Sequence, residues 1–202
     1  MKIPRWMLAV GLLVWAGLSM VVQATLMASH WYTLPTPDQE DVQLRDALGG
    51  LVPGHARDSW AAIHVLYSAC RCSHRVFDHL FDSKRPEGVY EAVLLIGEDQ
   101  DIETRAVTAG FDVWVLSPQE LEARFGIVSA PLLLVLGPDA SLRYAGGYTE
   151  RKQGYDVQDL RIIETLQAGR DPAELPLYGC GVSKELQQIL DPMGLTYDEG
   201  PP

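Results

Sequence analysis

Two of the three cysteines stand one residue apart, in the order Cys70-Arg71-Cys72. They come directly after the apolar run Ala61–Tyr67 and before apolar residues at helical spacing, so they mark a turn from a strand into a helix. The backbone N–H groups and the dipole at a helix start favour a thiolate, and the Arg71 side chain adds positive charge nearby. Because the thiolate is the form that attacks disulfides, the motif suits thiol–disulfide exchange.

An attacking thiol needs a second thiol that resolves the mixed disulfide, and two cysteines are candidates for this role. A Cys70–Cys72 disulfide would close a small, strained ring and would therefore be easily reduced. Cys180 stands between two glycines far along the chain, and Ser183 is suited to cap a helix over residues 184–190. Cys180 would resolve a mixed disulfide at Cys70, bond to either other cysteine, or serve as a small buried apolar residue.

The same motif also permits metal binding. Cys70, Cys72 and His74 form a C-x-C-x-H cluster, and thiolates with an imidazole suit Cu(I) or Zn(II). Cys180 would then supply a fourth ligand. Outside such a metal role, His74 is expected to be an exposed residue in the first turn of its helix.

The N-terminal residues predict a membrane segment. Lys2 and Arg5 precede an uncharged stretch over residues 6–29, and about 20 apolar residues suffice to cross a bilayer core. The positive-inside rule then keeps the N-terminus in the cytoplasm and exports the rest. A cleaved signal peptide ending at Ala24 is the alternative, but the apolar run continues past this site, which favours a retained anchor.

Composition limits the remaining possibilities. The 202 residues are 47% hydrophobic, with 16 basic against 27 acidic side chains and a net charge of −11. The chain can therefore bury a core, and the excess of acidic residues argues against a nucleic-acid partner. Three cysteines exclude a disulfide-rich scaffold and a four-cysteine metal site. No P-loop and no G-x-S-x-G elbow occur in the sequence.

The elements that must position the cysteines alternate along the chain. Buried strands are predicted over residues 61–67, 91–96, 111–116 and 131–136, with a hairpin partner over 141–145. Helices are predicted from Ser73 (as N-cap), over 99–109, from Ser117 to about residue 126, and over 157–168. The pattern predicts an α/β fold with a mixed sheet and helices on both faces, preceded by one transmembrane helix. The predicted domains are 1–30 (anchor), 31–57 (tether and lead-in), 58–170 (α/β domain) and 171–202 (C-terminal extension).

Over about residues 58–168 the chain resembles the thioredoxin superfamily, most closely its membrane-tethered, periplasmic TlpA-like branch. The strand AAIHVLY running into a cysteine motif and the segment LEARFGIVSAPLLLVLGPDASLRYAGGY carry this resemblance. It implies a cis-proline facing the cysteines, which carries over to Pro131 with Ala130 before it. A backbone edge beside that proline would be free to pair with a substrate segment.

The sequence departs from the superfamily pattern at the motif itself. Aligned on the first cysteine, Cys70 is the nucleophile, Ser73 takes the resolving position and Cys72 lies one residue early. Six residues before Cys70, where thioredoxins often have a buried acid that accepts protons, this sequence has His64. A histidine titrates near neutrality, so His64 is either a base for the site or a hydrogen-bonded core residue.

These observations predict a single-pass protein of a bacterial inner membrane with a thioredoxin-like oxidoreductase domain in the periplasm. Cys70 would attack, Cys72 or Cys180 would resolve, and Ala130, Pro131 and Arg71 would contact the substrate. The expected partners are protein thiols or disulfides and a membrane electron donor, with no cofactor. The alternatives are a copper chaperone or assembly factor using Cys70, Cys72 and His74, and a redox-inactive interaction module.

Overall fold

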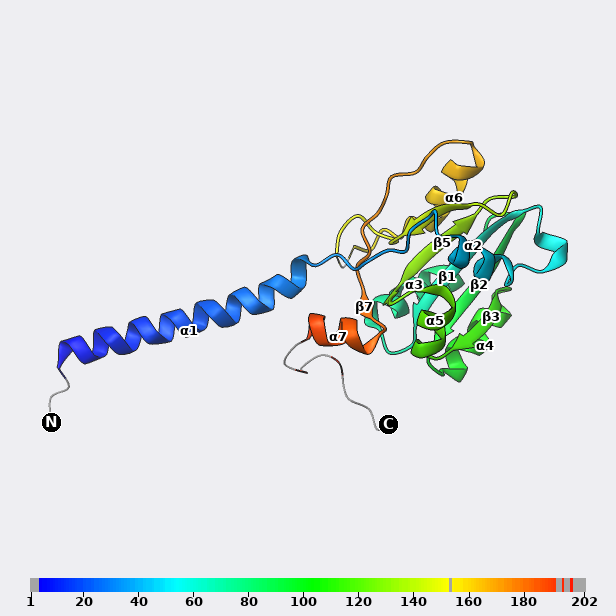
Figure 1. Cartoon of the computed structure of the whole chain (residues 1–202). Helices are drawn as coiled ribbons and strands as arrows, with labels where there is room; N and C mark the ends of the chain where they lie inside the picture. Colours follow the sequence, from blue (N-terminus) through cyan, green and yellow to red (C-terminus); the bar gives the residue numbers. More distant parts are fainter. Residues whose placement is uncertain (1–3, 153, 192–193, 195–196, 198–202) are drawn as a thin grey trace. The chain divides into compact units, whose positions relative to one another are not determined.

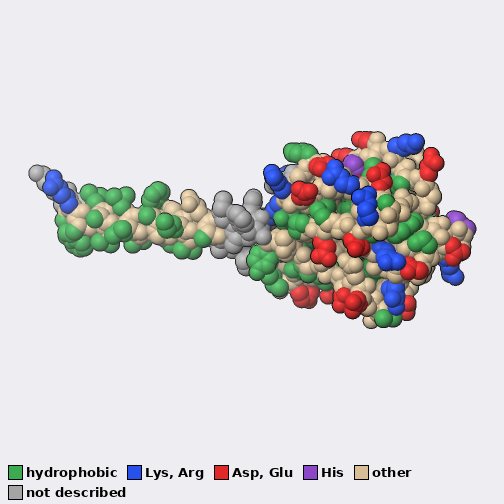
Figure 2. Space-filling view, turned by 90° about the horizontal axis from the view of Figure 1, so that it is seen from above, with side chains coloured by type: hydrophobic (Ala, Val, Ile, Leu, Met, Phe, Trp, Pro, Cys, Tyr) green, Lys and Arg blue, Asp and Glu red, His purple; other side chains and the backbone are tan. Residues whose placement is uncertain are grey.

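The computed structural model describes residues 4–152, 154–191, 194 and 197, with the backbone alone for 25–31. The chain divides into two compact units, Met1–Tyr32 and Thr33–Pro202. The first unit holds helix α1 (Arg5–Trp31). Its stretch Arg5–Ala24 is long and apolar enough, by length and composition, to cross a membrane. Figure 2 shows hydrophobic side chains along the described part of α1 and charged side chains of both signs scattered over the visible face of the second unit.

The second unit is built on a five-stranded mixed sheet with the strand order β3-β2-β1-β5-β6 (Figure 1). β1 pairs parallel with β2, β2 parallel with β3, and β5 antiparallel with both β1 and β6. A second sheet has only the two short strands β4 and β7, which pair antiparallel. The strands are β1 (Trp60–Tyr67), β2 (Val89–Ile96), β3 (Asp112–Leu116), β4 (Ser129–Ala130), β5 (Leu132–Leu136), β6 (Leu142–Gly146) and β7 (Cys180–Gly181).

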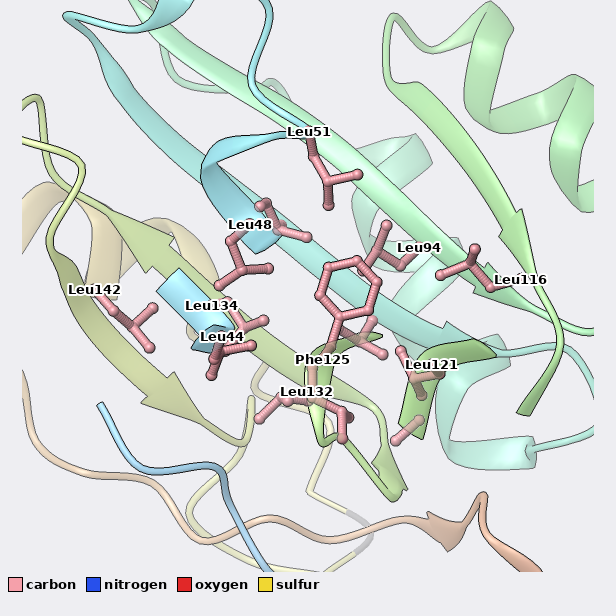
Figure 3. Packing of buried hydrophobic residues seen from close by; sticks show 14 of the residues in the cluster. Leu44, Leu48, Leu51, Leu94, Leu116, Leu121, Phe125, Leu132, Leu134 and Leu142 are labelled. Carbon is pink, nitrogen blue, oxygen red and sulfur yellow. The ribbon is translucent and has the colours of Figure 1, made fainter. Parts of the chain in front are cut away.

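Helices cover both faces of the large sheet. One core cluster joins apolar side chains of α3, α4 and α6 to one face, and the other joins α2 and α5 to the opposite face (Figure 3). The central strand β1 is buried on both sides, which explains its uninterrupted apolar sequence. The predicted α/β architecture, a mixed sheet flanked by helices, is therefore confirmed. The helices are α2 (Val42–Gly49), α3 (Arg71–Asp82), α4 (Gln100–Thr108), α5 (Pro118–Phe125), α6 (Asp159–Gln167) and α7 (Lys184–Leu190), with a 3-10 turn at Gly54–Ala56.

Local capping chemistry sets where several helices begin. Ser117 caps α5 in a reciprocal capping box with Glu120, and Ser183 accepts a hydrogen bond from the Leu186 amide at the start of α7. Both caps were expected from the sequence. The prediction of Ser73 as an N-cap is wrong, because α3 begins earlier with Cys70 as its N-cap. The Ser73 hydroxyl instead accepts a hydrogen bond from the Tyr67 amide at 3.0 Å.

The segment after α6 returns along the end of the sheet to β7 and α7 (Figure 1); residues 175–191 are called the C-terminal strap here. The Leu34 amide donates to the Leu177 carbonyl at 2.9 Å, and the Gly147 amide donates to the Leu175 carbonyl at 3.0 Å. A Cβ added at Gly147 would lie 2.1 Å from the Pro176 carbonyl oxygen, so only glycine permits this approach. Leu175, Leu177 and Val182 of the strap are buried in the two core clusters.

Candidate functional site

The three cysteines come from two distant parts of the chain and meet at the C-terminal end of β1. Cys70 is the N-cap of α3, where its amide donates to the Tyr67 carbonyl at 3.0 Å, and its side chain is fully buried. Cys72 lies in the first turn of α3 and Cys180 in β7, and both are partly exposed. Cys70 and Cys72 lie at this corner because of the local turn from β1 into α3. Cys180 reaches it because the C-terminal strap pairs with β4.

The three thiols form a hydrogen-bonded series with Cys70 in the middle. Cys70 contacts Cys180 on one side and Cys72 on the other. The hydrogen bond from Cys70 lowers the pKa of Cys180 and outweighs the effect of its burial. The same bond raises the pKa of Cys70, and the bond to Cys70 together with burial raises the pKa of Cys72. Negative charge is therefore favoured on Cys180, with the other two thiols as donors.

This charge distribution differs from the one expected at the helix start, where Cys70 was to carry the thiolate. Cys70 is buried and donates its proton toward Cys180, so burial and hydrogen bonding outweigh the helix N-terminus. The cations also differ from the expected Arg71, whose side chain is exposed. Arg75 and Lys152 are the charges that favour the thiolate of Cys72, and Lys152 also acts on Cys180.

Pro131 lies beside the cysteines at the start of β5. The Ala130–Pro131 peptide is cis, the form that the resemblance implies. Ala130 belongs to β4, and its partner across the two-stranded sheet is Cys180, with Gly181 opposite Ser129. The backbone edge that was expected to be free for a substrate segment is thus occupied by the chain's own strap.

A small open pocket of about 30 Å³ adjoins the site. Cys72 and Arg75 of α3, Pro131, Tyr148 and Tyr178 are among the side chains that line it. Pockets that hold small-molecule ligands measure roughly 300–1,000 Å³, so this one is too small for such a substrate.

His64 is fully buried on β1 and makes two hydrogen bonds, neither of them to a thiol. Its Nδ1 lies 2.9 Å from the Tyr148 hydroxyl, and its Nε2 lies 3.3 Å from Glu91 Oε1. Tyr148 also lines the pocket that Cys72 lines, so Tyr148 connects His64 to the pocket beside the cysteines. These contacts give His64 the hydrogen-bonded core environment that was the alternative to a base, and the base role stays a prediction.

A buried charge network surrounds His64, and the sequence analysis did not identify it. Arg85 donates to both Glu91 oxygens and to Asp159 Oδ2, while His79 Nε2 lies 2.8 Å from Asp159 Oδ1. Burial alone would raise the pKa values of both acids. The bonds from His64 and Arg85 lower the pKa of Glu91, and the bonds from His79 and Arg85 lower the pKa of Asp159 to about 2. The sequence held one signal of this network, because Glu91 is an acidic residue at the start of an apolar strand run.

His74 is exposed and makes a hydrogen bond to the backbone. Its Nε2 lies 2.6 Å from the Ser68 carbonyl oxygen, so this nitrogen is engaged by the backbone. Within residues 4–152 and 154–191, 194 and 197, no group of three or more His, Cys, Asp or Glu side chains is arranged to hold a metal ion. The copper alternative therefore stays a prediction.

Comparison with known proteins gives weak structural likenesses. No family model and no curated protein matches the sequence. An uncharacterised conserved protein from Geobacillus kaustophilus is 17% identical, with a TM-score of 0.48 over 62% of this chain and 77% of that one. A hypothetical protein from Sinorhizobium meliloti is 18% identical, with a TM-score of 0.47 over 63% and 81%.

A thioredoxin-family thiol:disulfide interchange protein from Chlorobium tepidum is 13% identical, with a TM-score of 0.38 over 55% of this chain and 81% of that one. Likenesses of this strength carry no argument about activity.

Proposed function

We propose that this chain is a thioredoxin-like thiol–disulfide oxidoreductase, anchored by α1 in a bacterial inner membrane with its second unit in the periplasm. The observation that carries the proposal is the contact of Cys70 with both Cys72 and Cys180, beside Pro131. Incidental cysteines from two distant segments rarely converge on one strand end. A thiol with a lowered pKa next to a second thiol is the arrangement that disulfide exchange needs.

The exchange conserves atoms and electrons without any cofactor. Cys70 first passes its proton to the Cys180 thiolate. The Cys70 thiolate attacks one sulfur of a partner disulfide, a Cys70–partner bond forms, and the other partner sulfur leaves as a thiolate that takes the proton from Cys180. The Cys180 thiolate then attacks the Cys70 sulfur, and the second partner sulfur leaves. The partner has gained two electrons, one proton from Cys70 by way of Cys180 and one proton from solvent, and the chain holds a Cys70–Cys180 disulfide.

Cys180 is the better resolving thiol of the two candidates. Its pKa is lowered and it contacts Cys70, whereas the pKa of Cys72 is raised. A thiol with a lower pKa is ionised to a larger fraction at neutral pH and so resolves a mixed disulfide sooner. A membrane electron donor would reduce the Cys70–Cys180 disulfide again, and the same steps in reverse would oxidise a dithiol partner.

The test uses the full chain in detergent micelles, reduced, freed of reductant and mixed with a peptide disulfide. Free thiols are trapped in acid and mapped by peptide mass spectrometry. We expect reduced peptide and a Cys70–Cys180 disulfide from the unaltered chain. We expect Cys180→Ser to resolve a Cys70–peptide disulfide slowly through Cys72, the Cys72→Ser, Cys180→Ser double variant to trap it, and Cys70→Ser to show no exchange.

The controls separate the two alternatives. Cys72→Ser is the matched control, because it removes a thiol from the same site and should leave the Cys70–Cys180 end state intact. A folded chain that keeps three free thiols with every disulfide offered contradicts the proposal. If that chain also binds one Cu(I), and Cys72→Ala abolishes the binding, the copper alternative holds. If it binds none, the interaction module holds.

A further inference from the structure

The strand edge beside Pro131 is already occupied in this fold. We propose that residues 178–182 of the C-terminal strap hold the place of a partner's extended segment at β4 and leave β4 when a partner binds. In this way the strap regulates access to Cys70. The consequence for exchange rests on the proposed function, but the occupancy itself rests on the contacts that follow.

The pairing is that of a strand added to a sheet edge. Ala130 lies opposite Cys180 and Ser129 opposite Gly181, and the Val182 amide donates to the Val128 carbonyl at 2.7 Å. Main-chain pairing of this kind is how extended peptides bind at exposed sheet edges, because it requires no particular side chains. A partner segment could therefore form the same bonds in place of the strap.

The approach at Gly179 is closer than any side chain allows. A Cβ at Gly179 would lie 1.9 Å from the Ala130 carbonyl oxygen and 2.5 Å from Pro131 Cδ. The backbone of the strap therefore lies directly against the proline edge, and glycine is required there. By the same geometry, we expect a partner segment to carry a glycine immediately before its cysteine.

The strap also closes the site. Cys70 is fully buried, so a partner disulfide cannot reach its sulfur while Cys180 contacts it. Access requires that residues 178–182 move away. Tyr178 lines the pocket beside Cys72, so the same movement would open this pocket.

The apolar side chains of the strap are more deeply buried before residue 178 than after residue 182. Leu175 and Leu177 are buried in the core clusters, which fixes the strap before residue 178. Beyond it, α7 has no fully buried residue, although Leu186 and Leu190 pack against the core, and Val182 is the fully buried apolar side chain that must leave the core on opening. Opening that begins after Leu177 therefore leaves both core clusters largely intact.

The test is Gly179→Ala in the full chain in detergent, with two readouts. Iodoacetamide alkylation of Cys70 is followed by mass spectrometry, and hydrogen exchange is followed at the Val182 and Ser183 amides. Both rates follow the fraction of chains with an open strap. We expect each to rise by about tenfold or more, which corresponds to a tenfold shift of the opening equilibrium. Gly54→Ala is the matched control, because a Cβ there meets no atom within 4 Å, and it should change neither rate.

A second variant guards against general unfolding. Val182→Ala weakens the strap without touching β4, and should also speed alkylation of Cys70 while the amides of β2 stay protected. Unchanged alkylation in both variants, with β2 protected, overturns the proposal. Neither readout uses a disulfide partner, so a chain inactive in exchange still tests the strap, and an unchanged strap leaves the exchange result standing.

Discussion

At Cys70 two hydrogen bonds of opposite sense meet. The Cys72 thiol donates to Cys70, and Cys70 donates to Cys180, so the proton of each thiol stabilises the next sulfur along the series. Removing the middle donor should therefore act on Cys180 most strongly, although Cys180 itself is unaltered.

This gives a pH-dependent prediction. Cys70→Ala removes the donor, so the pKa of Cys180 should rise, and the pH midpoint of its alkylation should move upward. Cys70→Ser keeps a hydroxyl donor and should produce a smaller rise. The measurement is the iodoacetamide rate of the Cys180 peptide against pH, read by mass spectrometry. Equal midpoints in all three chains would show that this hydrogen bond does not set the pKa of Cys180.

The site was partly predictable because its residues carry local signals. Two cysteines at a strand-to-helix corner and a proline that opens a strand can be identified from neighbours in the sequence. The position of Cys180 could not, because a two-residue strand pair between residues 129–130 and 180–181 has no periodicity of its own. The burial of Cys70 follows from that pair, so it was equally out of reach.

Between elements, the strongest polar link joins the segment before β2, β2 itself and α6. Arg85 binds Glu91 of β2 and Asp159 of α6, and its own side chain is 14% exposed. Its Nη1 is buried and has no hydrogen-bond partner among the described residues. Buried ion pairs contribute little net stability when intact, but removing one partner leaves uncompensated charge in the core.

We therefore expect Arg85→Met to lower the free energy of unfolding by roughly 3–5 kcal/mol, because Glu91 and Asp159 lose their counter-charge. The measurement is urea unfolding of the full chain in detergent at neutral pH. Arg143→Ala is the matched control, because its pair with Asp139 is 52% and 57% exposed and such pairs contribute below about 1 kcal/mol. Equal losses in the two variants would contradict the proposed importance of the buried network.

Most strands and helix starts could be predicted from apolar runs and capping residues in the sequence. The apolar runs became β1, β2 and β5, and the serine caps of α5 and α7 were found at their predicted positions. The start of α3 was misplaced because serine is the better cap by local chemistry, whereas here the Ser73 hydroxyl is engaged by the Tyr67 amide. Tertiary context overrides a local preference there.

For the whole molecule, α1 decides where the chemistry would take place. We expect the full chain, produced in a bacterium, to sediment with membranes and to resist alkaline carbonate extraction, because α1 offers 20 residues of apolar span. The chain beginning at Thr33 should stay in the soluble fraction. A mature N-terminus at Thr25 would instead identify residues 1–24 as a cleaved signal peptide.

An odd number of thiols in contact has a consequence for the electron count of the molecule. Three cysteines can never all be paired within one chain, so an oxidised chain always retains one thiol. Because Cys70 contacts both others, the spare Cys72 thiol can attack Cys70 in a Cys70–Cys180 disulfide and release Cys180. The oxidised chain would then be a pair of isomers that interconvert without any outside reductant, one with a Cys70–Cys180 disulfide and one with a Cys70–Cys72 disulfide and Cys180 as a thiol.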